Sequence, residues 1–388
     1  MSTSASSPAL DPEERRAIVE AVRDFTEARI APKAVEWDQA HHFPVDVLAE
    51  AGGLGLGAIY AKEDVGGSGL GRSEAVLIFE ELSRGDVAVA AYISIHNMAV
   101  WMIDTFGNDE QRRRWVPHLA GMDNLASYCL TEPDAGSDAG NLRTTARRDG
   151  DDWVLSGTKQ FISGAGASSV YVVMARTGGA GPKGISAFIV PAESEGLSFG
   201  AEEQKMGWHA QPTRQVVMDD VRVPAENLLG EEGQGFTIAM RGLNGGRLNI
   251  AACSLGGAQW AVDRAAEHLR TRQAFGGPLT DQQGLVFALA DAHIELQAAR
   301  TMLHDAAARL DAGDPDAAVV VAGAKRFVTD AGWKAANTAL QLHGGYGYLA
   351  EYGIEKVVRD LRVHQILEGT NEIMRVIVGR ALTQGGAA

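Results

Sequence analysis

The chain has 388 residues, of which 45% are hydrophobic and 22% charged. This balance is typical of a globular protein and excludes a disordered chain, except at the ends. The formal net charge of −15 repels polyanions and argues against a general nucleic-acid binder. The two cysteines, Cys129 and Cys253, cannot build a disulfide framework or a four-cysteine zinc site, so we expect an intracellular protein without a metal centre.

Targeting signals are also not expected. No apolar run is predicted to reach the ~18 residues of a membrane span. The N-terminal segment lacks the apolar core of a signal peptide, and its acids Asp11, Glu13 and Glu14 are unusual in a mitochondrial transit peptide. These features favour a cytoplasmic, bacterial protein.

The first third of the chain has helical periodicity. Residues 1–10 are predicted to form a loose tail, and Asp11 followed by Pro12 marks a capped helix start. Helical patterning continues to about residue 120. The string Gly-Leu-Gly-Leu-Gly-Ala at 53–58 matches a dinucleotide fingerprint, but a helix-like stretch precedes it rather than a strand. It therefore indicates a glycine-rich helix end.

The pattern changes twice along the chain. Short alternating segments separated by Gly, Asp and Pro predict strands at 152–156, 170–176, 185–191 and 214–218. From residue 234 onward, long alanine-rich amphipathic stretches predict a bundle of antiparallel helices. The expected organisation is a helical domain over 1–122, a β domain over 123–232 and a helical bundle over 233–388.

Three segments carry residues suited to chemistry. Residues 128–138 offer hydroxyls on a Gly/Pro-shaped backbone, and residues 161–163 place an aromatic ring and a hydroxyl at a strand end. In the third segment, Glu368 stands beside Gly369 just before a predicted helix. A carboxylate buried in an apolar loop is a candidate general base because burial raises its pKa toward neutrality. Taken alone, Glu368 is better explained as a helix N-terminal acid favoured by the dipole.

Taken together, ordered strings over nearly the whole chain resemble the acyl-CoA dehydrogenase family. The matching strings are LTEPDAGSD (130–138), FISG (161–164), RGLNGGR (241–247), FGGPL (275–279), QLHGGYGY (341–348), VRDLRV (358–363) and EGTNEIMR (368–375). Long strings in a fixed order are far more specific than any single short motif. Within the family, AYISIHNM (91–98) and RVHQILEG (362–369) are most similar to the branch that oxidises isobutyryl-CoA in valine breakdown.

The resemblance implies a homotetramer in which each protomer has a helical N-terminal domain, a central β-barrel and a C-terminal four-helix bundle. It also implies FAD, held between the β domain and the bundle and partly against a neighbouring subunit. Flavin contacts from the same subunit are expected at Tyr128, Leu130, Thr131, Ser137, Phe161, Ile162, Ser163, Thr370, Asn371 and Glu372. Contacts contributed by a neighbouring subunit are expected at Arg272, Phe275, Gln282, Gln283, Gln341, Leu342, His343, Gly344 and Gly345.

The implied reaction is the α,β-dehydrogenation of an acyl-CoA, with Glu368 as the catalytic base and an electron-transferring flavoprotein as electron acceptor. The thioester is expected to contact Ser137, Asn244, Gly245, Gly246, Arg247 and Arg380. Some relatives carry the base as a Glu immediately before the arginine of this turn. Here that position is Gly246, so no second carboxylate competes with Glu368.

The expected substrate is a short branched acyl-CoA, with isobutyryl-CoA converted to methacrylyl-CoA. 2-Methylbutyryl-CoA and a short straight chain stay open as alternatives. A flavin oxidase that uses O₂, or a non-catalytic protein that binds CoA or flavin, would also suit the scaffold. The retained Glu368 argues against both.

Overall fold

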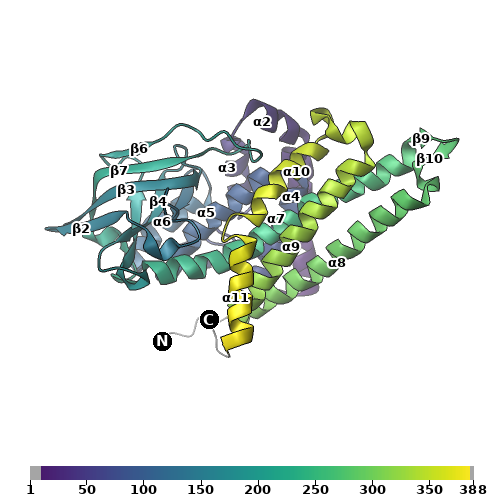
Figure 1. Cartoon of the computed structure of the whole chain (residues 1–388). Helices are drawn as coiled ribbons and strands as arrows, with labels where there is room; N and C mark the ends of the chain where they lie inside the picture. The colour runs from purple at the N-terminus through teal and green to yellow at the C-terminus, as the bar shows by residue number, and fades with distance from the viewer. Residues whose placement is uncertain (1–9, 385–388) are drawn as a thin grey trace.

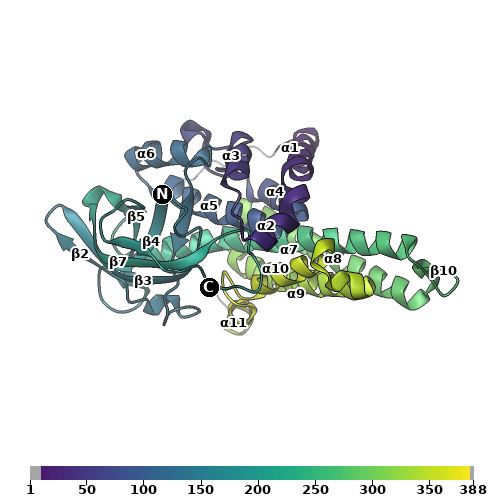
Figure 2. The same ribbon diagram turned by 90° about the horizontal axis from the view of Figure 1, so that it is seen from above.

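The structure is a computed structural model that describes residues 10–384. Helices at both ends of the chain flank a middle segment of strands, which confirms the expected order (Figure 1). Viewed from above, the sheet lies at one end, and the N-terminal helices lie along one side of the long C-terminal helices (Figure 2). Most of the tail expected over residues 1–10 lies outside the described residues.

The first third forms helices with the predicted start. The Asp11 carboxylate accepts hydrogen bonds from the backbone N–H groups of Glu13 and Glu14, and the Asp11 backbone N–H donates to the Glu14 carboxylate, which completes a capping box. The glycine-rich string at 53–58 begins at a helix end, as expected. The α-helices of this part are α1 (Pro12–Phe25), α2 (Ala34–Ala40), α3 (Val45–Gly53), α4 (Arg72–Gly85), α5 (Val87–Phe106) and α6 (Asp109–Ala120).

Helix α5 corrects the expectation that no apolar run approaches the length of a membrane span. The helix has 20 residues, and an 18-residue stretch of it has a mean hydropathy of 1.3, which is sufficient by length and composition to cross a bilayer. However, 89% of that stretch is buried inside the molecule, where α5 packs against α4, α6, β1 (Ala126–Cys129) and α7 (Gly235–Thr271). A helix that is apolar on all sides fits a position at the centre of a large core.

The middle third is a single curved sheet. Its strand order is β6-β7-β3-β2-β4-β5-β8, with β1 pairing in parallel to β4. The end strands β6 and β8 are not paired to each other in this order, so the middle domain is an open curved sheet and not the closed barrel that the resemblance implied. The remaining strands are β2 (Thr145–Asp149), β3 (Asp152–Ser163), β4 (Val170–Arg176), β5 (Ile185–Pro191), β6 (Leu197–Phe199), β7 (Thr213–Pro224) and β8 (Leu228–Leu229).

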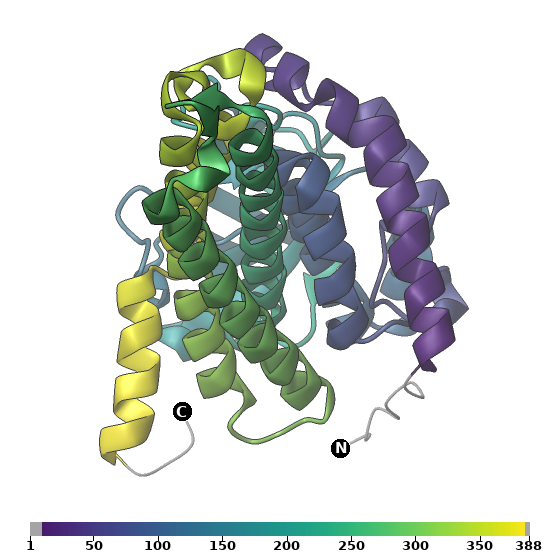
Figure 3. The same cartoon turned by 90° about the vertical axis from the view of Figure 1, so that its right-hand side faces the viewer.

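The last third contains three long helices that lie side by side (Figure 3). The longest, α7, has 37 residues and also packs against α4 and α5 of the N-terminal part. It therefore joins both helical parts in one core. The elements are α7 (Gly235–Thr271), a short hairpin β9 (Gln273–Ala274) and β10 (Gly277–Pro278), α8 (Gln283–Asp311), α9 (Ala317–Leu342), α10 (Ile354–Arg362) and α11 (Asn371–Gln384).

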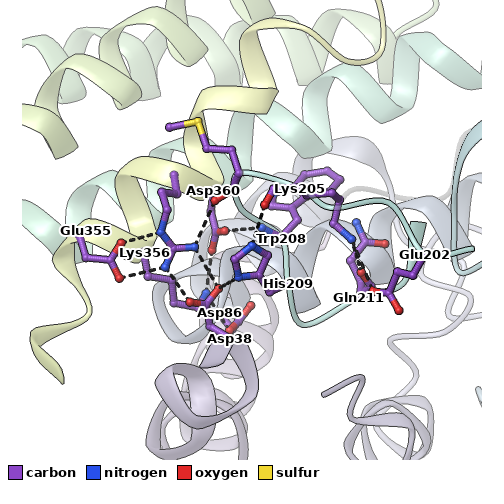
Figure 4. A network of polar contacts seen from close by, with 12 residues as sticks. Asp38, Asp86, Glu202, Lys205, Trp208, His209, Gln211, Glu355, Lys356 and Asp360 are labelled. Atoms are coloured by element: carbon purple, nitrogen blue, oxygen red, sulfur yellow. Dashed lines mark hydrogen bonds and ion pairs between the residues drawn. The ribbon is translucent and has the colours of Figure 1, made fainter. Parts of the chain in front are cut away.

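Ion pairs anchor α10, the helix that leads into the candidate base loop, to the rest of the molecule (Figure 4). The Lys356 ammonium lies 3.0 Å from Asp86 and 2.7 Å from Asp360, and all three side chains are nearly fully buried. Asp360 also accepts a hydrogen bond from the backbone N–H of Trp208, in the loop before β7, at 2.6 Å. Because removing one partner of a buried ion pair leaves an uncompensated charge, this cluster fixes α10 between the N-terminal helices and the sheet.

The chain changes from helix to strand between residues 120 and 126, and back to helix between residues 229 and 235. The expected domain limits at 122 and 232 fall within these connections and stay a prediction.

Candidate active site

Glu368 lies in the short loop that joins α10 to α11. A 3-10 turn, Val363–Gln365, follows α10, and Asn371 begins α11. The backbone of Glu368 is left-handed, with φ of 53°, and the next residue, Gly369, has φ of 90°. A non-glycine residue in this region is strained, so the surrounding structure must hold it there.

The Glu368 carboxylate lies directly beside helix α7, at Gly246. A Cβ atom built on Gly246 would lie 2.4 Å from Glu368 Oε2 and 2.9 Å from its Cδ. The absence of a side chain at position 246 therefore makes room for the carboxylate. The pair is 122 positions apart in sequence, and the fold brings them into contact.

The ionisation of Glu368 is set mainly by burial. Part of the residue stays accessible, but its Oε2 is buried and has no hydrogen-bond partner among the described residues. Burial raises the pKa of Glu368 to about 7, although the nearby cations Lys325 and Arg247 oppose the shift. A carboxylate with a pKa near neutrality is suited to accept and release a proton.

Two cations hold the backbone of this loop from opposite directions. Arg247 Nε, on α7, donates to the carbonyl oxygen of Glu368 at 3.0 Å. Lys325 Nζ, on α9, donates to the carbonyl oxygen of Gly369 at 2.9 Å. Arg247 also donates to Asn244 Oδ1 at 2.9 Å, so its guanidinium is engaged by protein groups in the expected CoA turn.

Lys325 was missed by sequence reasoning. It is fully buried, and burial lowers its pKa to about 8. The available signal was its spacing: Lys325 lies on the same helical face as Val321, Val328 and Thr329, all of them buried. A lysine on an apolar helix face is seldom buried without a specific partner.

A second group missed from the sequence lies on the other side of Gly246. The Arg72 guanidinium lies 3.6 Å from the centre of the Tyr60 ring, and a Cβ on Gly245 would lie 2.3 Å from an Arg72 nitrogen. Asn249 Nδ2 donates to the Tyr60 hydroxyl at 3.2 Å and to Ser94 at 3.1 Å. Polar side chains from several segments thus border the α7 turn that faces Glu368.

The expected flavin contacts of the β domain include several groups without protein partners. Among residues 10–384, no hydrogen bond is found for the hydroxyls of Thr131, Ser137 and Ser163, and the Tyr128 hydroxyl is buried without a partner. Phe161 has φ of 59° at a bulge of β3, and its side chain is 62% exposed. Free hydroxyls beside an exposed aromatic ring suit a ligand with a polar-edged ring, which is the chemistry of a flavin.

Tyr128 connects this surface to the base. Burial raises the pKa of the Tyr128 phenol well above its usual value, and the nearby Glu368 carboxylate raises it further. The adjacent segment is fixed by Lys159, which donates to the Leu130 carbonyl at 3.1 Å and pairs with Glu132 at 2.8 Å. Of the predicted β-domain residues, Tyr128 therefore lies near enough to Glu368 to sense its charge.

Four other predicted residues do not contact Glu368 in the chain. Thr370 Oγ1 accepts from the Ile373 N–H and so caps α11, while Glu372 pairs with Arg375 on the surface. Arg380 is exposed on α11, and Ser137 is exposed in the loop after β1. Their expected contacts with ligand stay predictions. Ile162 is buried, and Asn371 is buried and bonds to Lys325.

The residues expected to act on a neighbouring subunit gather at the far end of the long helices, away from the sheet (Figure 1). Arg272 lies over the Tyr346 ring at 5.3 Å. Phe275 is 89% exposed and Tyr348 is 81% exposed, so large rings are presented outward here. The others in this region are Gln282, Gln283, Gln341, Leu342, His343, Gly344 and Gly345. One protomer does not bring them to Glu368.

Comparison with known proteins covers nearly the whole chain. Family profiles for the N-terminal, middle and C-terminal domains of acyl-CoA dehydrogenase match residues 12–123, 127–221 and 233–383. A mitochondrial isobutyryl-CoA dehydrogenase of Dictyostelium discoideum is 52% identical, over 93% of this chain and 87% of that protein. The Bos taurus mitochondrial isobutyryl-CoA dehydrogenase is 50% identical, over 96% of this chain and 89% of that protein.

Solved structures agree with these matches. The butyryl-CoA dehydrogenase of Megasphaera elsdenii superposes with a TM-score of 0.93 and 37% identity, over 97% of this chain and all of that one. The expected fold class, with a helical N-terminal domain, a β middle domain and a helical C-terminal domain, is confirmed. The chain belongs to the acyl-CoA dehydrogenase family and is an FAD-dependent oxidoreductase of acyl-CoA.

Proposed function

We propose that the chain oxidises a short branched acyl-CoA, with isobutyryl-CoA converted to methacrylyl-CoA. The observation that carries the reaction is the Glu368 carboxylate, buried beside Gly246 with an unpartnered oxygen. The branched substrate is supported by two relatives that are about half identical over nearly the full chain and are named isobutyryl-CoA dehydrogenases. 2-Methylbutyryl-CoA and short straight chains are the competing substrates.

In this proposal Glu368 removes the α-proton of the thioester. The proton passes to a carboxylate whose pKa is about 7, so the base can be charged at neutral pH and still hold the proton afterwards. A bound FAD would supply the acceptor for the β-hydrogen, which would leave the substrate as hydride. The protein supplies position and electrostatics for a reaction whose redox chemistry belongs to the cofactor.

FAD is proposed to lie along the β-domain surface that carries Tyr128, Thr131, Ser163 and Phe161. The unpartnered hydroxyls and the exposed ring fit hydrogen bonding and stacking with the isoalloxazine. Two electrons are proposed to leave through an electron-transferring flavoprotein. A cytoplasmic location also stays a prediction, and the two isobutyryl-CoA dehydrogenases are named as mitochondrial.

An anaerobic titration with a panel of acyl-CoAs tests the substrate. The purified protein should be yellow, and isobutyryl-CoA should bleach the flavin absorbance faster and at lower concentration than n-butyryl-, 2-methylbutyryl- or octanoyl-CoA. A preference for octanoyl-CoA would contradict a short acyl pocket. A yellow protein that no acyl-CoA bleaches would contradict the reaction itself.

Leu367 is expected to control the choice between branched and straight chains. It precedes the base, is half-buried and packs against the core; many straight-chain relatives carry Tyr at this position. Leu367→Tyr should narrow or reverse the preference in kcat/KM for isobutyryl-CoA over n-butyryl-CoA. A methylene-sized difference in fit changes selectivity by roughly 10–200-fold. An unchanged ratio would exclude Leu367 as a wall of the pocket.

Arg272 is expected to couple cofactor binding to assembly. The residue lies at the end of the long helices away from the sheet, near the exposed rings of Phe275 and Tyr348. The proposed homotetramer would place it against the FAD of a neighbouring subunit. Arg272→Ala should lower flavin content and weaken the tetramer together, as measured by absorbance ratio and by sedimentation. A monomeric protein that retains a full complement of FAD would contradict this arrangement.

A further inference from the structure

Lys325 differs from the other buried lysines in having no acidic partner. Three lysines are buried among residues 10–384: Lys159, Lys325 and Lys356. Lys159 pairs with Glu132 at 2.8 Å, and Lys356 pairs with two aspartates. Among the same residues, no carboxylate lies within ion-pair distance of the Lys325 ammonium. A buried cation without a paired anion costs free energy of folding. This cost suggests that Lys325 has a role in function.

The contacts of Lys325 point to the base loop. Its ammonium donates to the Gly369 carbonyl at 2.9 Å and to Asn371 Oδ1 at 3.0 Å. The Asn371 amide is oriented by its own donations to Asp330 at 2.7 Å and to Thr329 at 3.0 Å. The oxygen of Asn371 is thereby turned toward the ammonium, and both acceptors of Lys325 belong to the three residues after Glu368.

The loop needs such support because Glu368 and Gly369 are both left-handed. Arg247 holds the first carbonyl and Lys325 the second, so the peptide between them is fixed at both ends. In this conformation the Glu368 carboxylate lies beside Gly246.

We propose that Lys325 is a positioning residue for the base: it holds the strained loop, and its positive charge favours the ionised form of Glu368. The inference rests on the proposed role of Glu368 and deepens it. Lys325 itself does not touch substrate. It acts on Glu368 in two ways: its hydrogen bond to the Gly369 carbonyl holds the loop, and its charge attracts the carboxylate.

The electrostatic surroundings support this role. Burial raises the pKa of Glu368, and Lys325 is the strongest of the nearby charges that lower it, ahead of Arg247. Conversely, among the charges that act on Lys325, Glu368 most strongly raises the pKa of the ammonium. An opposite charge at close range lowers the pKa of a carboxyl group by roughly 1–3 units. The titratable and charged groups that surround Glu368 are Lys325 on α9, Arg247 and Cys253 on α7, Tyr128 on β1, and Tyr60 in the segment before α4.

The test is the pH dependence of flavin reduction in the holoenzyme. In a stopped-flow experiment with isobutyryl-CoA, the rate of wild type should fall on the acid side as Glu368 becomes protonated. Lys325→Met removes the charge, so the acid limb, the part of the profile where the rate falls at low pH, should move to higher pH by at least about one unit. With a wild-type pKa of about 7, the rate at pH 7 should then fall about fivefold or more, and the deficit should shrink at pH 9.

Two variants separate the charge from the hydrogen bond. Lys325→Arg keeps the charge, and its acid limb should stay near that of wild type even if the overall rate falls. Lys325→Gln keeps a donor for the Gly369 carbonyl but not the charge. The acid side of the pH–rate profile of Lys325→Gln should shift as in Lys325→Met. If the methionine variant does not fold, the glutamine variant provides the same test.

The control is Lys334→Met on the same helix. Lys334 is exposed and pairs with Glu295 on the surface, so its removal should leave the acid limb unchanged. A uniform loss of rate in Lys325→Gln, without a shift of the limb, would overturn the inference and leave Glu368 as base. A Glu368→Gln variant with wild-type activity would instead overturn the proposed function.

Discussion

Glu368→Gln is expected to bind FAD and acyl-CoA but to reduce its flavin 10²- to 10⁴-fold more slowly, the usual loss for a removed general base. This corresponds to about 3–5 kcal/mol of activation free energy. Glutamine has nearly the same size and shape, and Oε2 of Glu368 accepts no hydrogen bond among the described residues. The change should therefore disturb the chemistry far more than the fold.

Single-turnover reduction and ligand titration distinguish these effects. The loss should appear in kcat, while the dissociation constant of a non-oxidisable acyl-CoA analogue should change little. Glu226→Gln provides a control, because Glu226 is not among the expected site residues and its carboxylate forms only an exposed pair with Arg114. Flavin reduction at the wild-type rate in Glu368→Gln would exclude this residue as the base.

Moving the carboxylate to position 246 is expected to restore part of the activity that Glu368→Gly loses. The Cδ of a glutamate lies two covalent bonds beyond its Cβ. That span is comparable to the 2.9 Å between a Cβ at position 246 and the present Cδ of Glu368. A glutamate from α7 can therefore place its carboxylate in nearly the same space. Recovery should be partial, because a displacement of about 1 Å can cost a hundredfold in rate.

The single variant Gly246→Glu gives the opposite result and serves as the control. With Glu368 present, the new Cβ would lie 2.4 Å from Oε2, and two carboxylates in one buried site raise each other's pKa. We expect this variant to be less active than wild type, and the double variant Glu368→Gly with Gly246→Glu to be more active than Glu368→Gly. A double variant no better than Glu368→Gly alone would show that position 246 does not reach the reacting carbon.

Local patterns in the sequence determined the order of helical and β parts and the start of α1. Hydrophobic spacing reports how a segment covers a core, and the capping residues around Asp11 act within four positions. Local context made Glu368 only one possible base, and the resemblance of strings along the whole chain to a known family singled it out. The same local view failed for α5, whose all-round apolar surface is explained only by burial among neighbouring elements.

The tertiary structure alone decided how the base is held. Gly246 and Lys325 lie 122 and 43 positions before Glu368. The resemblance placed Gly246 in the thioester turn, but only the structure shows the room it leaves for the carboxylate and the contact of Lys325 with the loop. The packing of α7 against the loop leaves room for the Glu368 carboxylate at Gly246. The packing of α9 brings Lys325 to the Gly369 carbonyl. Burial, and with it the pKa of Glu368 near neutrality, is a property of that packing. The sequence by itself determined which carboxylate could act as base, whereas the long-range contacts, which no local periodicity encodes, decided its position and its ionisation.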